Sequence, residues 1–142
     1  HTYKKYNLIF MNPPFSEGYS DYKNINQCKK ALTNIINKLT QKEFVAPKSI
    51  VILGNCDYED SIIGNEDYIG SFRIDKTNNL SIIEEDTIRY FSVKDFKGME
   101  ADIIVFINHI KTRELEVKEL CEQYVALTRP RYYLYVLNIT IQ

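Results

Sequence analysis

The stretch Ser92–Ile107, SVKDFKGMEADIIVFI, decides the fold that this sequence predicts. It ends in an unbroken apolar run, which is typical of a strand buried on both faces of a sheet. A polar turn containing Lys97, Gly98 and Glu100 comes directly before that run. Downstream, Gln123–Leu137 repeats this order, because QYVALTRPR closes an amphipathic helical pattern and the strand-like run YYLYVL follows it. The sequence therefore predicts two strands, each of which directly follows a polar cluster.

Helical and strand patterns alternate along the rest of the chain. Apolar residues fall at steps of three and four over Ile25–Leu39, which predicts a helix with one buried face. The alternation predicts βαβ units and therefore a mostly parallel α/β sheet flanked by helices. The remaining expectations are strands at Asn7–Met11, Ser49–Leu53, Thr87–Val93, Ala101–Asn108 and Tyr132–Ile139, a helix at Glu114–Thr128, a loop at Asn12–Lys23, and loops with one short helix over Asn55–Leu80.

Length and composition limit the class of protein. A chain of 142 residues suits a single domain that buries a core without metal or disulfides. The net charge of −1 means that any contact with nucleic acid must be a local patch. Cys28, Cys56 and Cys121 are odd in number and widely spaced, so we expect free thiols in the cytoplasm. No apolar run is long enough to span a membrane, and no cluster of ligands suggests a metal site. Because a strand pattern follows His1 almost at once, we expect residues 1–142 to be one domain of a longer protein.

The two polar clusters suit a site for phosphate or nucleic acid, which we expect at the carboxyl edge of the sheet. Each has a simpler alternative. Arg129, taken alone, could stabilise the end of a helix as a cation does. Lys97, Gly98 and Glu100, taken alone, could form an ordinary solvated turn in which glycine supplies an unusual φ.

Together, the two motifs resemble those of the UvrD/Rep-type superfamily 1 DNA helicases. The family patterns read approximately T-[IV]-H-x-x-K-G-L-E and Y-V-A-[LI]-[TS]-R-A-[KR], each before a strand. This chain has Ser92 to Glu100 (SVKDFKGME) and Tyr124 to Arg131 (YVALTRPR). The resemblance implies the C-terminal, second RecA-like domain of an ATP-dependent helicase, with the fold of P-loop NTPases.

The resemblance also implies roles for particular residues. Arg129 matches the arginine that reaches the γ-phosphate of ATP, whereas Pro130 stands where alanine is usual. Lys97, Gly98 and Glu100 match the turn beside the nucleotide, with the acid near the ribose. Ser92 and Lys94 stand where Thr and His face the single strand, so they are the expected nucleic-acid contacts.

The sequence contains no G-x-x-x-x-G-K-[ST] loop and no paired acid motif for Mg²⁺. ATP and Mg²⁺ would therefore be bound mainly by the N-terminal RecA-like domain of the same protein, and this chain alone would be inactive. The expected partners are that domain and single-stranded or partly duplex DNA, with no membrane involved.

Three alternatives remain open at this stage. The chain could be a RecA-like interaction module without catalytic function, because Ser92, Lys94 and Pro130 depart from the family pattern. Asn12–Phe15 (NPPF) resembles the signature of adenine-N6 DNA methyltransferases, but no two glycines are spaced to form a methyl-donor turn. Tyr132, Tyr133 and Tyr135 could stack on bases, although an aromatic strand is more commonly part of a core.

Overall fold

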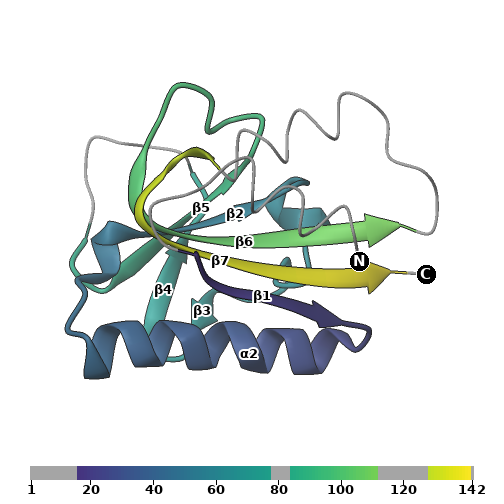
Figure 1. Cartoon of the computed structure of the whole chain (residues 1–142), viewed down its shortest axis with the longest axis horizontal. Coiled ribbons are helices and arrows are strands. Elements are labelled where there is room, and N and C mark those ends of the chain that lie inside the picture. The colour runs from purple at the N-terminus through teal and green to yellow at the C-terminus, as the bar shows by residue number, and fades with distance from the viewer. Residues whose placement is uncertain (1–15, 78–83, 112–127, 142) are drawn as a thin grey trace.

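The strands of the described residues form a single sheet (Figure 1). The computed structural model describes residues 16–77, 84–111 and 128–141. The strands are β1 (Ser16–Tyr22), β2 (Ile50–Gly54), β3 (Tyr68–Ile69), β4 (Phe72–Asp75), β5 (Thr87–Ser92), β6 (Ala101–Lys111) and β7 (Pro130–Ile141). Their order in the sheet is β1-β7-β6-β2-β5-β4-β3. All neighbours are parallel except the pair β3 and β4, which confirms the predicted mostly parallel α/β sheet.

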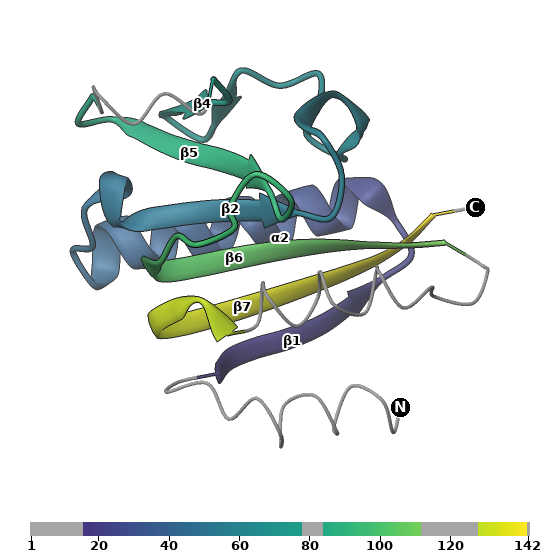
Figure 2. The same ribbon diagram turned by 90° about the horizontal axis from the view of Figure 1, so that it is seen from above.

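The helix α2 (Ile25–Asn37) lies across one face of this sheet, as Figures 1 and 2 show from two directions. Its start is capped by Asn24, whose side-chain oxygen accepts a hydrogen bond from the backbone N–H of Gln27 at 3.1 Å. The residues that α2 buries are Cys28, Leu32 and Ile36. They recur at a spacing of four, so the helix presents one apolar stripe to the sheet. The predicted helix is confirmed, and a π-helical turn at Lys38–Lys42 extends it.

The sheet has an apolar layer on each face. On the side of α2, alternate strand residues such as Ile52, Val105 and Leu137 join the helix in one cluster. On the other side, Leu53 and Phe106 belong to a second cluster. Strands that are buried on both faces have continuous apolar sequences, as β2 (Ile50–Gly54) and β6 (Ala101–Lys111) do.

Two of the sequence predictions need correction. The segment Ser16–Tyr22 was predicted to lie in a loop, but it is β1 and pairs in parallel with β7. The sequence of this segment is polar and does not indicate a strand. β1 is the outer strand beside β7, and its backbone pairing with β7 determines its structure. The predicted loop region Asn55–Leu80 contains a short 3₁₀ turn (Tyr58–Asp60) and also the strands β3 and β4.

The strands predicted at Ser49–Leu53, Thr87–Val93 and Tyr132–Ile139 are confirmed as β2, β5 and β7, with small shifts at their ends. A further 3₁₀ turn, Pro47–Ser49, leads into β2. The expected strand Asn7–Met11 and almost all of the expected helix Glu114–Thr128 lie outside the described residues. Within the residues that are described, no helix is long and apolar enough to cross a membrane.

Candidate functional site

The two motifs meet at the starts of β6 and β7. The backbone N–H of Ala101 donates to the carbonyl oxygen of Arg129 at 3.5 Å, and Ala101 pairs with Pro130 in the sheet. Glu100 and Arg129 therefore precede neighbouring parallel strands at the same edge. That edge is the amino edge, so the prediction of a carboxyl-edge site is wrong for this pair. The reason is geometric, because a residue that directly precedes a strand lies at the amino end of that strand.

Gly98 gives the turn before β6 its shape. Its φ is +78°, in the region that side chains with a Cβ rarely adopt, so glycine is required for the backbone conformation. A Cβ at this position would meet no atom within 4 Å. Lys97, Gly98 and Glu100 are all exposed. The turn therefore offers an open backbone surface with one cation and one carboxylate.

Arg129 lies between the end of a helix and the start of a strand. Thr128 is helical and Pro130 is the first residue of β7, a position that proline tolerates because it needs no ladder donor there. Arg129 is half-buried, and among the residues that the structure describes its Nε has no hydrogen-bond partner. A buried donor without a partner is costly, so this guanidinium is suited to receiving an acceptor from another molecule.

Glu100 is paired with a different arginine. The Nε of Arg131 lies 3.4 Å from Oε2 of Glu100 and 3.6 Å from Oδ1 of Asp102. The side chains of Arg131 and Glu100 are 56% and 60% exposed, so this ion pair is weakened by solvent. The amino edge thus carries Arg129, Arg131, Glu100 and Asp102, and within the described part of the chain the ion pairs there involve Arg131.

The predicted nucleic-acid contacts lie at the opposite edge. Ser92 is the last residue of β5, and Gly54 pairs with both Ser92 and Ile107. Ser92 is therefore level with Ile107, which follows Glu100 by seven residues, or about 23 Å along a strand. Ser92 is buried, and its hydroxyl accepts from the backbone N–H of Asp95 at 3.2 Å, whereas Lys94 is exposed. The structure places Glu100 beside Arg129 and places Ser92 at the opposite ends of the strands.

A buried polar network at the carboxyl edge was not predicted from the sequence. The backbone N–H and Nδ1 of His109 both approach Oδ1 of Asn55 at 2.9 Å, and Nε2 of His109 lies 3.2 Å from the backbone N–H of Ile62. Because Ile62 can only donate, Nε2 accepts and Nδ1 carries the proton of a neutral imidazole. Nδ2 of Asn55 donates to Oδ1 of Asn108, whose own Nδ2 donates to Asn138 at 2.8 Å. Burial lowers the pKa of His109 to about 4, in keeping with the neutral ring.

Cys56 also lies near His109, with its Sγ 3.6 Å from Nδ1. Such a pair could act as a nucleophile and base only if the thiol were readily ionised. Burial raises the pKa of Cys56 to about 11 and lowers that of His109, so both groups stay neutral at pH 7. This pair is therefore structural. Cys28 and Cys56 are free thiols, and Cys121 lies outside the described residues.

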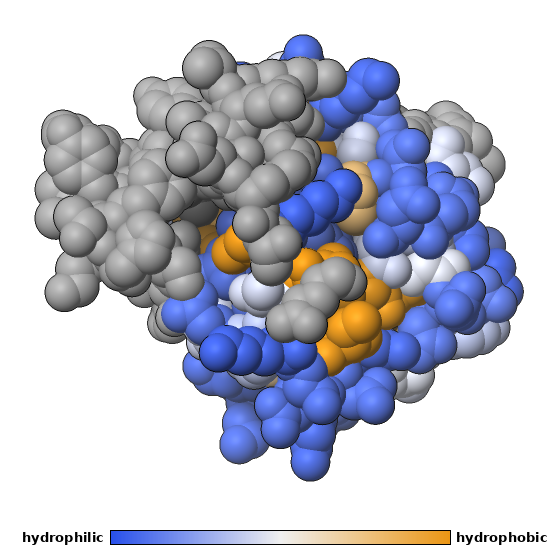
Figure 3. All heavy atoms as spheres, turned by 90° about the vertical axis from the view of Figure 1, so that its right-hand side faces the viewer, coloured by the Kyte–Doolittle hydropathy of each residue, from blue (hydrophilic) through white to orange (hydrophobic). Residues whose placement is uncertain are grey.

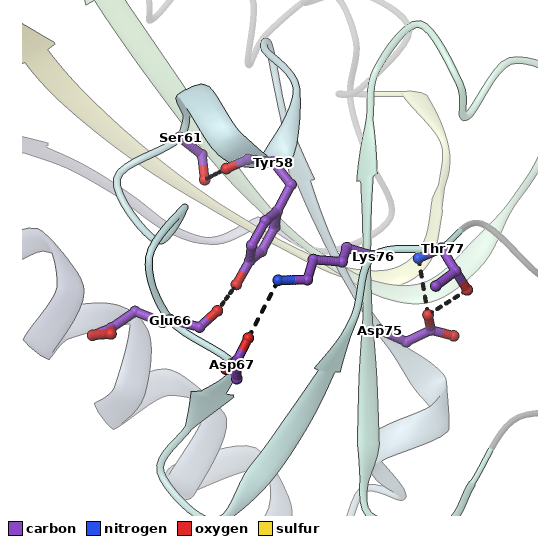
Figure 4. Close-up of polar contacts among 7 residues, drawn as sticks. All are labelled: Tyr58, Ser61, Glu66, Asp67, Asp75, Lys76 and Thr77. Carbon is purple, nitrogen blue, oxygen red and sulfur yellow. Dashed lines mark hydrogen bonds and ion pairs between the residues drawn. The ribbon is translucent and has the colours of Figure 1, made fainter.

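The loop after this network is fixed by contacts that Figure 4 shows. Lys76 lies 3.3 Å from Asp67 and 4.5 Å from the centre of the Tyr58 ring, and the Tyr58 hydroxyl donates to the carbonyl of Glu66. Beside this loop, Ser92 lines a cavity of about 130 Å³. Three carboxylates, those of Asp57, Glu59 and Asp95, also line it. Lys76 lines it as well, so the carboxylates outnumber the cations and the cavity is unfavourable for a phosphate at Ser92.

Figure 3 looks onto the carboxyl ends of the central strands, where an apolar area is surrounded by hydrophilic residues. A hollow of about 410 Å³ at this end is lined by Lys23, Ile25, Thr140 and Ile141. Among these described lining residues, Lys23 and Thr140 carry the polar side chains. In the part of the chain that the structure describes, no three His, Cys, Asp or Glu residues are placed to hold a metal ion. The NPPF motif, Asn12–Phe15, lies outside that part.

Comparison with known proteins supports the fold. No protein-family model matches this sequence, and no curated protein matches it either. The structure is similar to the crystal structure of the C-terminal domain of a possible DNA helicase from Lactobacillus plantarum WCFS1, with a TM-score of 0.64 and 14% sequence identity. The alignment covers 89% of this chain and 73% of the other. At this level of identity, the similarity establishes a shared α/β fold.

Proposed function

We propose that this chain is the second RecA-like motor domain of an ATP-dependent DNA helicase or translocase, in which Arg129 contacts the γ-phosphate of ATP. The observation that carries the proposal is the placement of Arg129 beside Glu100 at the amino edge, joined by the 3.5 Å contact from Ala101 to the carbonyl of Arg129. The last residue of the first motif, Glu100, and Arg129 of the second motif therefore lie beside each other. The similar fold of a possible DNA helicase domain agrees with this assignment.

At this surface the chain would supply charge and shape. Arginine stays protonated at any physiological pH and donates in a fixed geometry that suits phosphate oxygens. The unpartnered Nε of Arg129 would gain an acceptor when a phosphate arrives. MgATP, held mainly by the other RecA-like domain, supplies the phosphoryl group whose charge Arg129 would stabilise. The open turn at Gly98 would allow close approach of the ribose to Glu100, with Lys97 nearby.

The nucleic-acid contact would be made at the other edge. Lys94 is exposed and can approach a phosphate as a point charge. The hydroxyl of Ser92 already accepts a hydrogen bond from Asp95 and is buried, so we assign Ser92 to shaping the turn that presents Lys94. This revises the role that the resemblance implied for Ser92.

The test is nucleic-acid-stimulated ATP hydrolysis by a protein that contains this chain together with its phosphate-loop domain. Arg129→Ala should reduce the rate roughly 10³-fold or more, since arginines in this role contribute about that much in other NTPases. Arg73→Ala is a matched control, because Arg73 is an exposed arginine on β4, near the far edge of the sheet. An unchanged rate in Arg129→Ala would contradict the proposal.

A second candidate is a RecA-like interaction module without ATPase activity. The burial of the Ser92 hydroxyl favours it, because one of the two expected nucleic-acid contacts is not available at the surface. In that case the protein would show no ATP hydrolysis that depends on Arg129, and Arg129 would serve only as a cation at a helix end.

A further inference from the structure

The strand β7 contains a bulge at the amino edge. Ala101 pairs with Pro130 and Ile103 pairs with Tyr133, so two residues of β7, Arg131 and Tyr132, lie opposite the single residue Asp102. A bulge of this kind leaves a residue outside the ladder and redirects its side chain. As a result Tyr132 is 53% exposed, whereas Tyr135 further along the strand is 6% exposed and belongs to the core.

Beside the bulge lies a cavity of about 260 Å³. Tyr132, Tyr133 and Ile103 line it from the sheet, and Val45 and Ala46 line it from the segment before β2. Asp102 also lines the cavity and supplies a carboxylate to it. This cavity, the aromatic slot, is slightly smaller than the range of roughly 300–1,000 Å³ that is usual for drug-sized ligands. It therefore suits one planar ring system.

The residue that precedes the lining residue Val45 is an exposed aromatic residue in an unusual conformation. Phe44 directly precedes Val45, is 85% exposed and has a φ of 57°. A bulky residue rarely adopts this φ, and such conformations concentrate at functional sites. The turn is fixed by the backbone, because Val45 N–H donates to the carbonyl of Leu39 at 2.8 Å. The second side of the slot is thus held in place without a ligand.

We propose that the aromatic slot binds an unpaired nucleobase that carries an exocyclic amine, supplied by a free nucleotide or by a single strand. Tyrosine rings stack on the faces of bases, and Asp102 can accept a hydrogen bond from the amine. The slot would suit any planar ring that carries an amine. The choice of a nucleobase as that ring rests on the proposed function. It adds a contact that neither the nucleotide residues nor Lys94 would make.

The charges around the slot determine which bases it accepts. Arg131 lies 3.6 Å from Oδ1 of Asp102, which leaves Oδ2 for a donor from the ligand. Adenine and cytosine would present an amine to this oxygen. Hypoxanthine and uracil carry a carbonyl oxygen at the same position, which a carboxylate repels. The slot therefore discriminates between bases that stack equally well.

The experiment is an NMR titration of this chain with adenosine and, separately, with inosine, which has a similar ring but no exocyclic amine. Adenosine should shift the amide signals of Val45, Ala46, Asp102 and Tyr133, and inosine should bind about tenfold more weakly, since a hydrogen bond to a charged group contributes that much. Asp102→Asn should reduce this difference between the two nucleosides. Tyr132→Leu should weaken adenosine binding by roughly tenfold through loss of stacking.

Tyr68→Leu is the matched control, because Tyr68 is 54% exposed and lies on β3 at the far edge of the sheet. It should leave adenosine binding unchanged. A deoxyadenosine strand that binds more tightly than adenosine would identify nucleic acid as the source of the base, and equal affinity would identify a free nucleotide.

Equal binding of adenosine and inosine, or signal shifts that avoid the slot, would overturn the proposal. The titration needs no hydrolysis, so its failure is distinguishable from failure of the ATPase test on Arg129.

Discussion

The two ends of the sheet are built in different ways. At the amino edge, Glu100, Arg131 and Tyr132 are exposed, and Arg129 has a buried Nε without a partner. At the carboxyl edge, Asn55 and His109 are joined by several hydrogen bonds within the chain, while Nδ2 of Asn138 in the same network has no partner among the described residues. Polar groups that already satisfy one another contribute to stability, whereas polar groups left exposed or unpaired are available to ligands. We therefore propose that the amino edge makes the nucleotide contacts, and that the carboxyl edge combines a structural network with the exposed nucleic-acid contact Lys94.

The largest effect should come from breaking the carboxyl-edge network. Asn55→Ala removes an acceptor from His109 and a donor to Asn108, so buried polar groups lose their partners. We expect the free energy of unfolding to fall by about 3 kcal/mol. Asn34→Ala, on the exposed face of α2, should change it by less than about 0.5 kcal/mol. Urea denaturation followed by circular dichroism measures both, and equal effects would contradict a structural role for the network.

Acid should weaken the same network through His109. Its pKa is about 4 when folded, below its ordinary value of 6.5, so the unfolded chain binds the proton more readily between these values. The stabilising contribution of neutral His109 is therefore complete above pH 6.5 and is lost as the pH falls toward 4, by at most about 3 kcal/mol. Denaturation curves of the natural chain and of His109→Gln across this range isolate the contribution. Parallel pH dependence in the two proteins would show that His109 titrates normally in the fold.

Gly54 is the last residue of β2 and lies at the carboxyl edge, where we expect close packing to require glycine. A Cβ on Gly54 would collide with the hydroxyl group of Tyr90, which donates to the carbonyl of Cys56 at 2.7 Å. Gly54→Ala should therefore lower the free energy of unfolding by about 2 kcal/mol, as overpacking in a core does. The double variant Gly54→Ala with Tyr90→Phe removes the colliding hydroxyl and should recover part of the loss. No recovery would mean that backbone constraints, and not Tyr90, require glycine.

The smallest effect on stability is expected at the amino edge. Arg131→Ala removes ion pairs to Glu100 and Asp102 that are largely exposed, so the free energy of unfolding should change by less than about 1 kcal/mol. Thermal unfolding in low and high salt checks this expectation. A loss as large as that of Asn55→Ala would remove the distinction between the two edges.

The sequence was most informative about the strands and about the pairing of the two motifs. β2 and β6 are buried on both faces, so their apolar runs identify them directly. Glu100 and Arg129 could be predicted to share a site because each precedes a strand of the same sheet. The general rule that ligands bind at the carboxyl ends of parallel strands predicts the wrong edge here, because Glu100 and Arg129 precede their strands.

Other features depend on contacts between distant segments. Asn55 and His109 are 54 positions apart in sequence, and each reads as an isolated polar residue beside an apolar run. β1 is polar, and only its pairing with β7 makes it a strand. The exposure of Tyr132 and the burial of Tyr135 follow from a bulge whose position is set by pairing with β6. No local pattern in the sequence carries this information.

The most direct test of the account is to add MgATP to a protein that contains this chain together with its phosphate-loop domain, and to follow the backbone amide signals of this chain by NMR. The account predicts that the signals of Gly98, Glu100, Arg129 and Arg131 shift, and that the signals around Asn55 and His109 do not. Shifts centred on the carboxyl edge, with the amino-edge signals unchanged, would contradict the claim that the amino edge is where the ligand binds.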